Sequence, residues 1–279
     1  MAEYDVEKLS PALGARVTGL DLREEVDAEI VAELRRLFVD NAVLCFPGQK
    51  VSAQDQARFA GFFGRVDAGF RPPSYQLDNT NQSRGVMLVT NIRKDGKQIG
   101  SLPDGEMHFH SDGSHRDVPY RATTLFAIKI PSRGGETLFA NLANAYDALP
   151  QDRQERLEGI EANHAYRYDL VTRDLNDDSR SDLNRAVHPL VRTHPDTGRK
   201  SLYLSRLMTQ TVVGMGKEES EAILLPLFDH IEKPEFVYAH AWTPGDLVIW
   251  DNRTVNHARN DFPADEDRLL RRYTVSEPA

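Results

Sequence analysis

The chain is organised around one short stretch that holds two histidines and an aspartate. It reads Glu106-Met107-His108-Phe109-His110-Ser111-Asp112 and precedes a long apolar run. Side chains alternate between the two faces of an extended strand, so we expect His108, His110 and Asp112 to share one face. Two imidazoles and a carboxylate around a small ion, with the remaining positions open, suit non-haem Fe(II). The alternative is a polar strand end with a buried, hydrogen-bonded histidine, because a metal site needs a further ligand from elsewhere in the chain.

Composition favours a globular chain with a substantial core. The 279 residues are 40% hydrophobic and 28% charged, which argues against disorder, and the length fits one large domain or two small ones. Because no linker pattern marks a boundary, we expect one domain over residues 1–279. A net charge of -9 argues against a nucleic-acid partner. No apolar run is long enough to span a membrane, and the acidic N-terminus does not look like a secretory signal. Cys45 is the single cysteine, which excludes an intrachain disulfide and fits the cytoplasm. Its apolar surroundings favour a buried, inert thiol.

Short strand patterns with turn residues between them dominate the chain after the histidine stretch, and they favour a sandwich, barrel or jelly roll. Helical periodicity predicts helices over 27–40, after Ser52, at about 144–160 and at about 217–232, and the last pattern contains Pro226. The expected strands are 42–46, 86–89, 123–130, 137–140, 187–191, 201–204, 236–240, 246–250 and 269–275.

A further ligand and two anion-binding side chains are predicted near the C-terminus. His257 follows a strongly apolar strand pattern and is the best candidate for a distant ligand. Arg268 and Arg272 are four residues apart in a strand-like run, so they should share a face, whereas Arg271 should point the other way. Buried guanidiniums need anions, and two of them beside a metal-binding histidine can hold two carboxylate-like groups. The alternative is surface ion pairing with the acidic residues 265–267.

Ordered motifs along nearly the whole chain resemble one known family. Their order and spacing are far more specific than a His-x-Asp pair alone. The motifs are 13–22, His110-Ser111-Asp112, Gly134-Gly135-Glu136-Thr137-Leu138-Phe139-Ala140-Asn141, 188–195 with 197–199 and 202–203, Trp250-Asp251-Asn252-Arg253, His257, Arg268 and Arg272. Together they are similar to the taurine/2,4-dichlorophenoxyacetate dioxygenase (TauD/TfdA) family of Fe(II)- and 2-oxoglutarate-dependent oxygenases.

The resemblance implies a mainly β fold, a cupin-like double-stranded β-helix (jelly roll) with helices packed outside it. Thr137 and Arg268 match the positions that hold the distal carboxylate of 2-oxoglutarate, and Arg272 matches the arginine that pairs with the substrate's anionic group. The implied cofactors are Fe(2+), 2-oxoglutarate and O2, and the implied reaction hydroxylates a small organic anion with release of succinate and CO2. The implied iron ligands are His110, Asp112 and His257.

The chain departs from the taurine enzymes at positions used on the amino-sulfonate. Gly69 and Pro72 stand where those enzymes carry a histidine and a tyrosine, and Glu106 stands where they carry an asparagine. The expected substrate is therefore a small carboxylate, sulfonate or phosphonate rather than taurine. One hypothesis is that Glu106 receives an ammonium or hydroxyl group of this substrate. The alternative for Glu106 is a loop carboxylate hydrogen-bonded to backbone amides.

Two other functions remain open at this point. A cupin-type metalloprotein would use His108 and His110 as a pair and would give Thr137 and Arg268 no role. A non-catalytic relative would keep the barrel as a small-molecule binder. For the oxygenase, we expect the polar segment 67–105 to form a lid that excludes water. We also expect a homodimer or homotetramer, as is common in the family.

Overall fold

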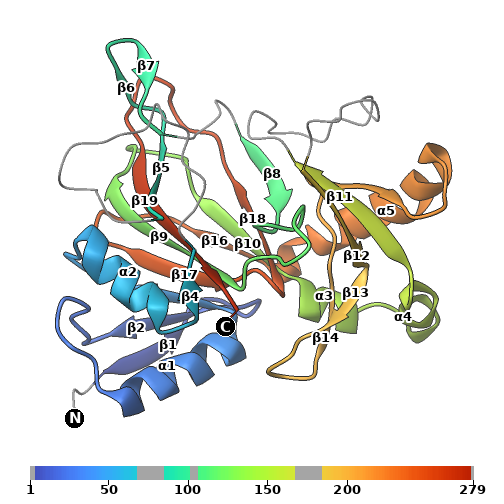
Figure 1. Ribbon diagram of the computed structural model, residues 1–279, viewed down its shortest axis with the longest axis horizontal. Coiled ribbons are helices and arrows are strands. Elements are labelled where there is room, and N and C mark those ends of the chain that lie inside the picture. Colours follow the sequence, from blue (N-terminus) through green and yellow to red (C-terminus); the bar gives the residue numbers. More distant parts are fainter. Residues whose placement is uncertain (1–3, 68–84, 101–105, 167–183, 278–279) are drawn as a thin grey trace.

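Two mainly antiparallel sheets form the centre of the computed structural model, which describes residues 4–67, 85–100, 106–166 and 184–277 (Figure 1). The larger sheet contains, in spatial order, β1 (Asp5–Lys8), β2 (Ala15–Thr18), β3 (Val43–Phe46), β17 (Leu247–Asp251), β9 (Ala122–Lys129), β19 (Leu269–Ser276) and β4 (Arg65–Val66), with β5 (Met87–Thr90) also on β19. The smaller sheet contains β16 (Val237–His240), β10 (Thr137–Asn141), β18 (Val255–Arg259) and β8 (Met107–His110).

Each face of the larger sheet has its own apolar cluster. Leu125, Val248 and Trp250 of the larger sheet pack with Phe139 and Val255 of the smaller one, so a core lies between the two sheets. The opposite face is covered by α1 (Ala28–Asn41) and α2 (Ala53–Gly61), which bury a second apolar cluster there (Figure 1). This arrangement confirms the prediction of a jelly roll with helices outside it.

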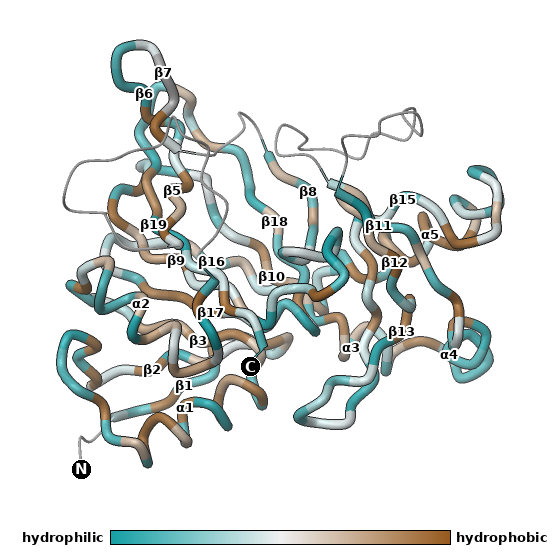
Figure 2. The backbone as a smooth tube through the Cα atoms, viewed as in Figure 1, coloured by the Kyte–Doolittle hydropathy of each residue, from teal (hydrophilic) through white to brown (hydrophobic). Residues whose placement is uncertain are grey.

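A third apolar cluster lies beside the two sheets and is mainly helical. It is built from α3 (Leu142–Asp147), α4 (Gln151–Leu157), α5 (Lys217–Ile231) and the short helix η3 (Pro234–Phe236). The small sheets next to it contain β11 (Glu161–Tyr166), β12 (Asn184–Pro189) and β15 (Thr209–Val212), and β13 (Val191–Thr193) with β14 (Lys200–Leu202). The hairpin of β6 (Arg93–Lys94) and β7 (Lys97–Gln98) projects at the opposite end, and its tip is hydrophilic (Figure 2).

Most of the predicted elements are confirmed, and the errors have local causes. The helix predicted over 144–160 is two helices, because Pro150 lacks the backbone N–H that a continuous helix needs and instead precedes α4. Ser52 is the N-cap residue of α2, as predicted, and forms a capping box with Asp55. The strand β18 was not predicted, although it carries His257. The predicted lid falls partly on 68–84 and 101–105, outside the described residues, as do Gly69 and Pro72.

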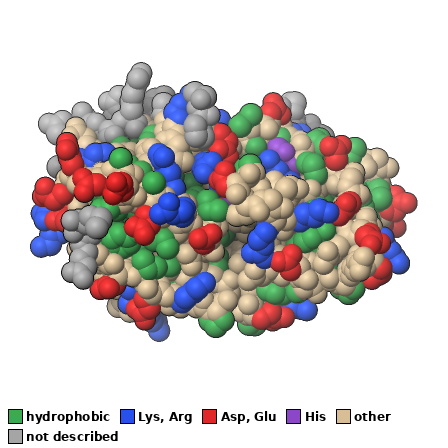
Figure 3. Space-filling view, turned by 90° about the horizontal axis from the view of Figure 1, so that it is seen from below, with side chains coloured by type: hydrophobic (Ala, Val, Ile, Leu, Met, Phe, Trp, Pro, Cys, Tyr) green, Lys and Arg blue, Asp and Glu red, His purple; other side chains and the backbone are tan. Residues whose placement is uncertain are grey.

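Charge is distributed in small, mixed groups over the face drawn in Figure 3. Acidic and basic side chains of the described residues alternate there, without a broad basic patch. Among the described residues, none of the helices is both long and apolar enough to cross a membrane.

Candidate metal and cosubstrate site

Strand pairing in the smaller sheet brings two of the predicted ligands together. β8 and β18 are antiparallel neighbours, and His110 lies directly opposite His257 in the register. The two imidazole rings have their centroids 4.1 Å apart. His257 also packs on Trp250, with a centroid separation of 4.6 Å, so its ring is held from the side of the larger sheet. The histidines therefore meet because of the sheet register, although they are far apart in sequence.

Asp112 joins them by a different route from the one predicted. β8 ends at His110, and Asp112 lies in the turn that follows, so the expectation that strand alternation positions Asp112 is wrong. The turn nevertheless brings its carboxylate to the histidines, with Oδ1 3.9 Å from Nε2 of His110 and Oδ2 3.9 Å from Nε2 of His257. One ligand atom from each of the three residues lies within 4.8 Å of the others. The group has the composition and spacing to hold a divalent ion.

The protonation states of these three side chains suit metal binding. Burial lowers the pKa of His110, and burial together with His110 lowers the pKa of His257, so both imidazoles are neutral at neutral pH. Burial alone would raise the pKa of Asp112, but Arg272 and the two histidines outweigh it and hold that pKa well below its usual range. Two neutral imidazoles and one carboxylate are the protonation states that a metal ion requires of its ligands.

Two buried residues to which the sequence analysis assigned no role support the carboxylate of Asp112, one directly and one through the other. Thr123 of β9 donates a hydrogen bond from Oγ1 to Oδ2 of Asp112 at 2.7 Å. Asn252 donates from Nδ2 to the same Oγ1 at 3.0 Å, and its backbone carbonyl accepts from Ser111 Oγ at 2.6 Å. Because Thr123 accepts from Asn252, its own hydroxyl proton is directed to the carboxylate. A threonine at the start of a strand pattern that is otherwise largely apolar was the available signal in the sequence.

Arg272 lies beside the same carboxylate. Its Nη2 is 2.8 Å from Oδ1 of Asp112, and its Nη1 is 3.5 Å from the sulfur of Met87. Arg271 points to the opposite side of β19, as predicted, where its Nε donates to Gln56 at 2.7 Å and its guanidinium lies over Phe126. Strand alternation therefore separates Arg271, which ties α2 to the sheet, from Arg272, which faces the three-residue group.

Arg268 is a buried cation with an unsatisfied guanidinium. It is 1% exposed, and its Nη2 donates to the carbonyl of Gly135 at 3.2 Å. Its Nε and Nη1 find no hydrogen-bond partner among the described residues. Burial, with a smaller contribution from Arg259, lowers the pKa of Arg268 to about 9. An anion would stabilise a buried guanidinium whose N–H groups lack partners, and a carboxylate can accept hydrogen bonds from both Nε and Nη1.

Thr137 begins β10, the strand next to β18, and its hydroxyl is buried. Trp242, which was not predicted, donates its indole N–H to Oγ1 of Thr137 at 3.0 Å. An oxygen that accepts from Trp242 keeps its own proton available for an acceptor such as a carboxylate.

Glu106 is the predicted site residue that the structure does not bring into this group. Its side chain is 69% exposed, and its Oε1 lies 3.8 Å from Nε2 of His108. His108 is itself partly exposed and is not part of the three-residue group.

Comparison with known proteins identifies the family. The model of the "Taurine catabolism dioxygenase TauD, TfdA family" matches residues 5–274. The chain belongs to the TauD/TfdA family. This TauD/TfdA protein is 35% identical over 280 residues to the alpha-ketoglutarate-dependent 2,4-dichlorophenoxyacetate dioxygenase of Cupriavidus pinatubonensis, with 97% of each chain covered. It is 30% identical over 284 residues to the (S)-phenoxypropionate/alpha-ketoglutarate dioxygenase of Sphingobium herbicidovorans, which covers 96% of this chain and 93% of the relative.

A solved structure supports the same family assignment. The crystal structure of AAD-2 in complex with Mn(II) and N-oxalylglycine has a TM-score of 0.81 and 29% identity, and the match covers 99% of this chain and 98% of that chain. The TauD/TfdA protein is therefore an Fe(II)- and 2-oxoglutarate-dependent dioxygenase with the family's jelly roll. The expectation of an oxygenase is confirmed, and the cupin-type and non-catalytic alternatives are set aside.

Proposed function

We propose that His110, Asp112 and His257 hold the catalytic Fe(II). The support is their proximity within 4.8 Å and their deprotonated state. Three protein ligands leave room on the metal for a chelating 2-oxoacid and for oxygen. Iron bound there supplies oxygen activation coupled to the conversion of 2-oxoglutarate into succinate and CO2, with hydroxylation of the substrate.

Arg268 and Thr137 receive the distal carboxylate of 2-oxoglutarate in this proposal. The observation that carries it is the buried guanidinium of Arg268, whose Nε and Nη1 lack partners among the described residues. A dicarboxylic 2-oxoacid can satisfy those groups at one end and chelate the metal at the other. Fixing the far end restricts the orientation of the keto-acid head, which is a positioning effect on the reaction.

Arg272 receives the anionic group of the substrate, which we propose is a small carboxylate. The support is its position 2.8 Å from Asp112, on the face of β19 that looks toward the ligands. The two relatives described above are named for carboxylates, 2,4-dichlorophenoxyacetate and phenoxypropionate. Phenoxyalkanoic acids are therefore the first candidates, and other small carboxylates, sulfonates, phosphonates and sulfate esters follow.

A substrate panel tests this assignment. Each of these anions, together with a matched neutral or cationic analogue, is supplied with Fe(II), 2-oxoglutarate and O2, and succinate formation is compared with the rate without substrate. Carboxylates should stimulate succinate formation above that basal rate. The result that would overturn the substrate class is stimulation only by neutral or cationic compounds.

Replacing Arg272 tests its role separately. Arg272→Met should raise the KM for the anion by about 10- to 100-fold, the effect of losing a charge-assisted hydrogen bond. At saturating Fe(II), which offsets any loss of metal affinity caused by removing the partner of Asp112, basal 2-oxoglutarate turnover should persist. Equal loss of both rates would mean that Arg272 acts only through its ion pair with Asp112.

Glu106 remains a proposed contact for a substrate ammonium or hydroxyl group. Its exposure means that such a contact would lie at the solvent side of the site. Glu106→Gln should raise the KM for a substrate that carries such a group and leave basal 2-oxoglutarate turnover unchanged. Equal loss of both would count against a substrate contact.

We also retain three broader proposals from the sequence. They are a homodimer or homotetramer, a single domain over residues 1–279 and a cytoplasmic location. The first two are consistent with the family, and the single cysteine is consistent with the third. Light scattering of the purified protein tests the oligomeric state directly.

A further inference from the structure

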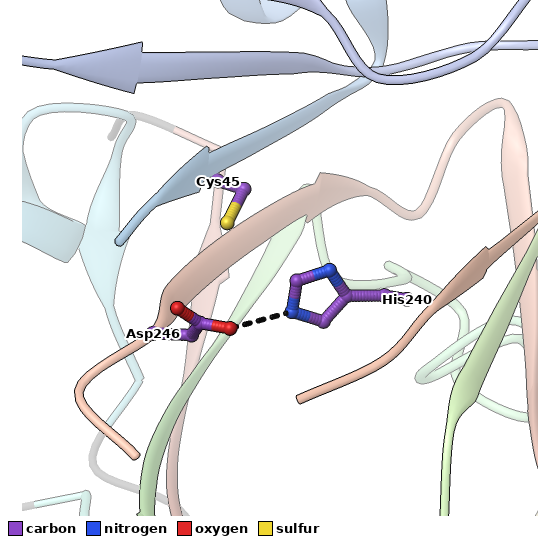
Figure 4. Close-up of side chains that lie close together, drawn as sticks. All are labelled: Cys45, His240 and Asp246. Atoms are coloured by element: carbon purple, nitrogen blue, oxygen red, sulfur yellow. Dashed lines mark ion pairs between the residues drawn. The ribbon is translucent and has the colours of Figure 1, made fainter. Parts of the chain in front are cut away.

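A second cluster of metal-ligating side chains lies in the core, apart from the three proposed iron ligands. It consists of Cys45, His240 and Asp246, which are 2%, 4% and 5% exposed. One ligand atom from each lies within 4.8 Å of the others, and Figure 4 shows the thiol, the imidazole and the carboxylate facing a common space. The family's reaction requires none of the three.

The three side chains come from both sheets. Cys45 lies on β3 opposite Val248 of β17 and faces the core between the sheets. Asp246 directly precedes β17, and its Oδ2 accepts the backbone N–H of Thr243 at 2.9 Å. His240 is the last residue of β16 in the smaller sheet. An ion held here would connect the larger sheet to the smaller one.

His240 supplies the observation that points to a ligand. Its Nε2 lies 3.2 Å from Oδ2 of Asp246, yet this buried nitrogen makes no hydrogen bond to any described residue. Nδ1 lies 3.0 Å from the hydroxyl of Tyr238. If Nδ1 donates its proton to Tyr238, the lone pair of Nε2 faces a carboxylate oxygen, which is repulsive unless a cation lies between them. A hydrogen bond from the second ring nitrogen is the usual support of a metal-binding histidine.

We propose that Cys45, His240 and Asp246 form a second divalent-metal site that takes Zn²⁺. Thiolate sulfur, imidazole nitrogen and carboxylate oxygen are all zinc ligands, and three of them leave one position of a tetrahedron for water. The sulfur ligand favours zinc over the harder Mg²⁺ and Ca²⁺. On binding, the thiol of Cys45 releases its proton to solvent, and the sulfur bonds to the metal instead. The ion would stabilise the junction of the two sheets.

Cobalt titration tests the site, because a Co(II)–thiolate bond gives an intense charge-transfer absorption in the near ultraviolet. Cys45 is the single cysteine of the chain, so that absorption can come from no other residue. The full-length protein, freed of metal with a chelator, should develop the band on addition of Co(II). After addition of Zn²⁺ and dialysis, the protein should also retain two equivalents of Zn²⁺, one at this site and one at the proposed iron site. Absence of the thiolate band in the wild-type protein overturns the proposal.

Two variants distinguish this site from the proposed iron site. His257→Ala removes an iron ligand and should keep the thiolate band and one equivalent of Zn²⁺. Cys45→Ser should lose the band and the second equivalent while retaining 2-oxoglutarate turnover, since Cys45 takes no part in that reaction. If the band disappears in His257→Ala or persists in Cys45→Ser, the assignment is wrong. Failure of the proposed iron site would leave the wild-type band unaffected, so the two proposals fail separately.

Discussion

Asp112 is held from two directions, and its orientation depends on residues that do not belong to the proposed ligand set. Thr123 donates to one carboxylate oxygen at 2.7 Å, and Arg272 lies 2.8 Å from the other. Removing a hydrogen-bond or ion-pair partner that orients a metal ligand typically lowers metal affinity 10- to 100-fold.

Thr123→Val should weaken Mn(II) or Fe(II) binding by about 10- to 100-fold, because the isosteric side chain cannot donate to Asp112. Thr123→Ser keeps the hydroxyl and is the matched control, with an affinity close to that of the wild-type protein. Isothermal titration under anaerobic conditions measures both. Similar affinities for the valine and serine variants would show that the hydroxyl does not orient the ligand.

The unsatisfied guanidinium of Arg268 lowers the stability of the ligand-free fold, and we propose that it binds 2-oxoglutarate. Arg268→Met removes an unsatisfied buried guanidinium, so the ligand-free variant should unfold at a temperature no lower than the wild-type protein. Its KM for 2-oxoglutarate should rise by about 10- to 100-fold, since a hydrogen bond to a charged group contributes about 1.5 to 3 kcal/mol. Steady-state kinetics and thermal unfolding decide this, and an unchanged KM would contradict the proposed role.

At the scale of the elements, the turn before β10 shapes the site around Arg268. Gly135 has φ 71°, and a Cβ placed on it would lie 3.2 Å from Nε of Arg268. Gly198, in the turn between β13 and β14, has φ 70° and open space where its Cβ would be. The two glycines therefore have the same backbone conformation, but only Gly135 contacts the proposed cosubstrate site.

Gly135→Ala and Gly198→Ala should each destabilise the fold by about 1 to 2 kcal/mol, the cost of a left-handed conformation for alanine. Only Gly135→Ala should also raise the KM for 2-oxoglutarate, because it displaces Arg268. Chemical denaturation and kinetics on the two variants separate the effects. Equal KM values would mean that Arg268 tolerates the added methyl group.

Periodicity predicted the elements better than it predicted how they pair. Residues 27–40 and the cap at Ser52 were predicted because helix periodicity and capping are local properties. The strand that carries His257 was not predicted, since Val255–Arg259 is a short run of mixed polarity without a clear alternation. Asp112 lies beside His110 and His257, but the turn after β8 brings it there rather than strand alternation, because the end of β8 depends on sheet contacts that the sequence does not specify locally.

At the scale of the whole molecule, buried neutral histidines limit stability in acid. His164 is 1% exposed, and burial, with His188 as a smaller cause, lowers its pKa to about 3. The unfolded chain takes up a proton on this residue below about pH 6.5, whereas the folded protein does not until near pH 3. Lowering the pH through that window therefore favours the unfolded state.

The free energy of unfolding should fall by about 2 kcal/mol per such histidine between pH 7 and about pH 5. His164→Gln, which cannot titrate, should reduce the steepness of this fall, whatever its effect on stability at neutral pH. Urea unfolding at several pH values provides the comparison. An identical pH dependence for the variant and the wild-type protein would exclude His164 as a cause.

The site as a whole was predictable only in outline. The sequence motifs identified His110, His257 and Arg268 as candidates, because a histidine or an arginine is unusual within or beside a strand pattern. Thr123, Asn252 and Trp242 were missed, since their roles exist only once distant strands pair. A threonine hydroxyl in a strand does not reveal from sequence alone which acceptor it will meet.

A crystal structure of this protein grown with Mn(II) and N-oxalylglycine, the pair present in the AAD-2 complex, tests the proposed metal and cosubstrate site directly. We predict that the metal is bound by His110, Asp112 and His257. We also predict that the distal carboxylate of N-oxalylglycine accepts hydrogen bonds from Arg268 and Thr137. Metal bound without His257, or a carboxylate that leaves Arg268 without an anion, would contradict the account.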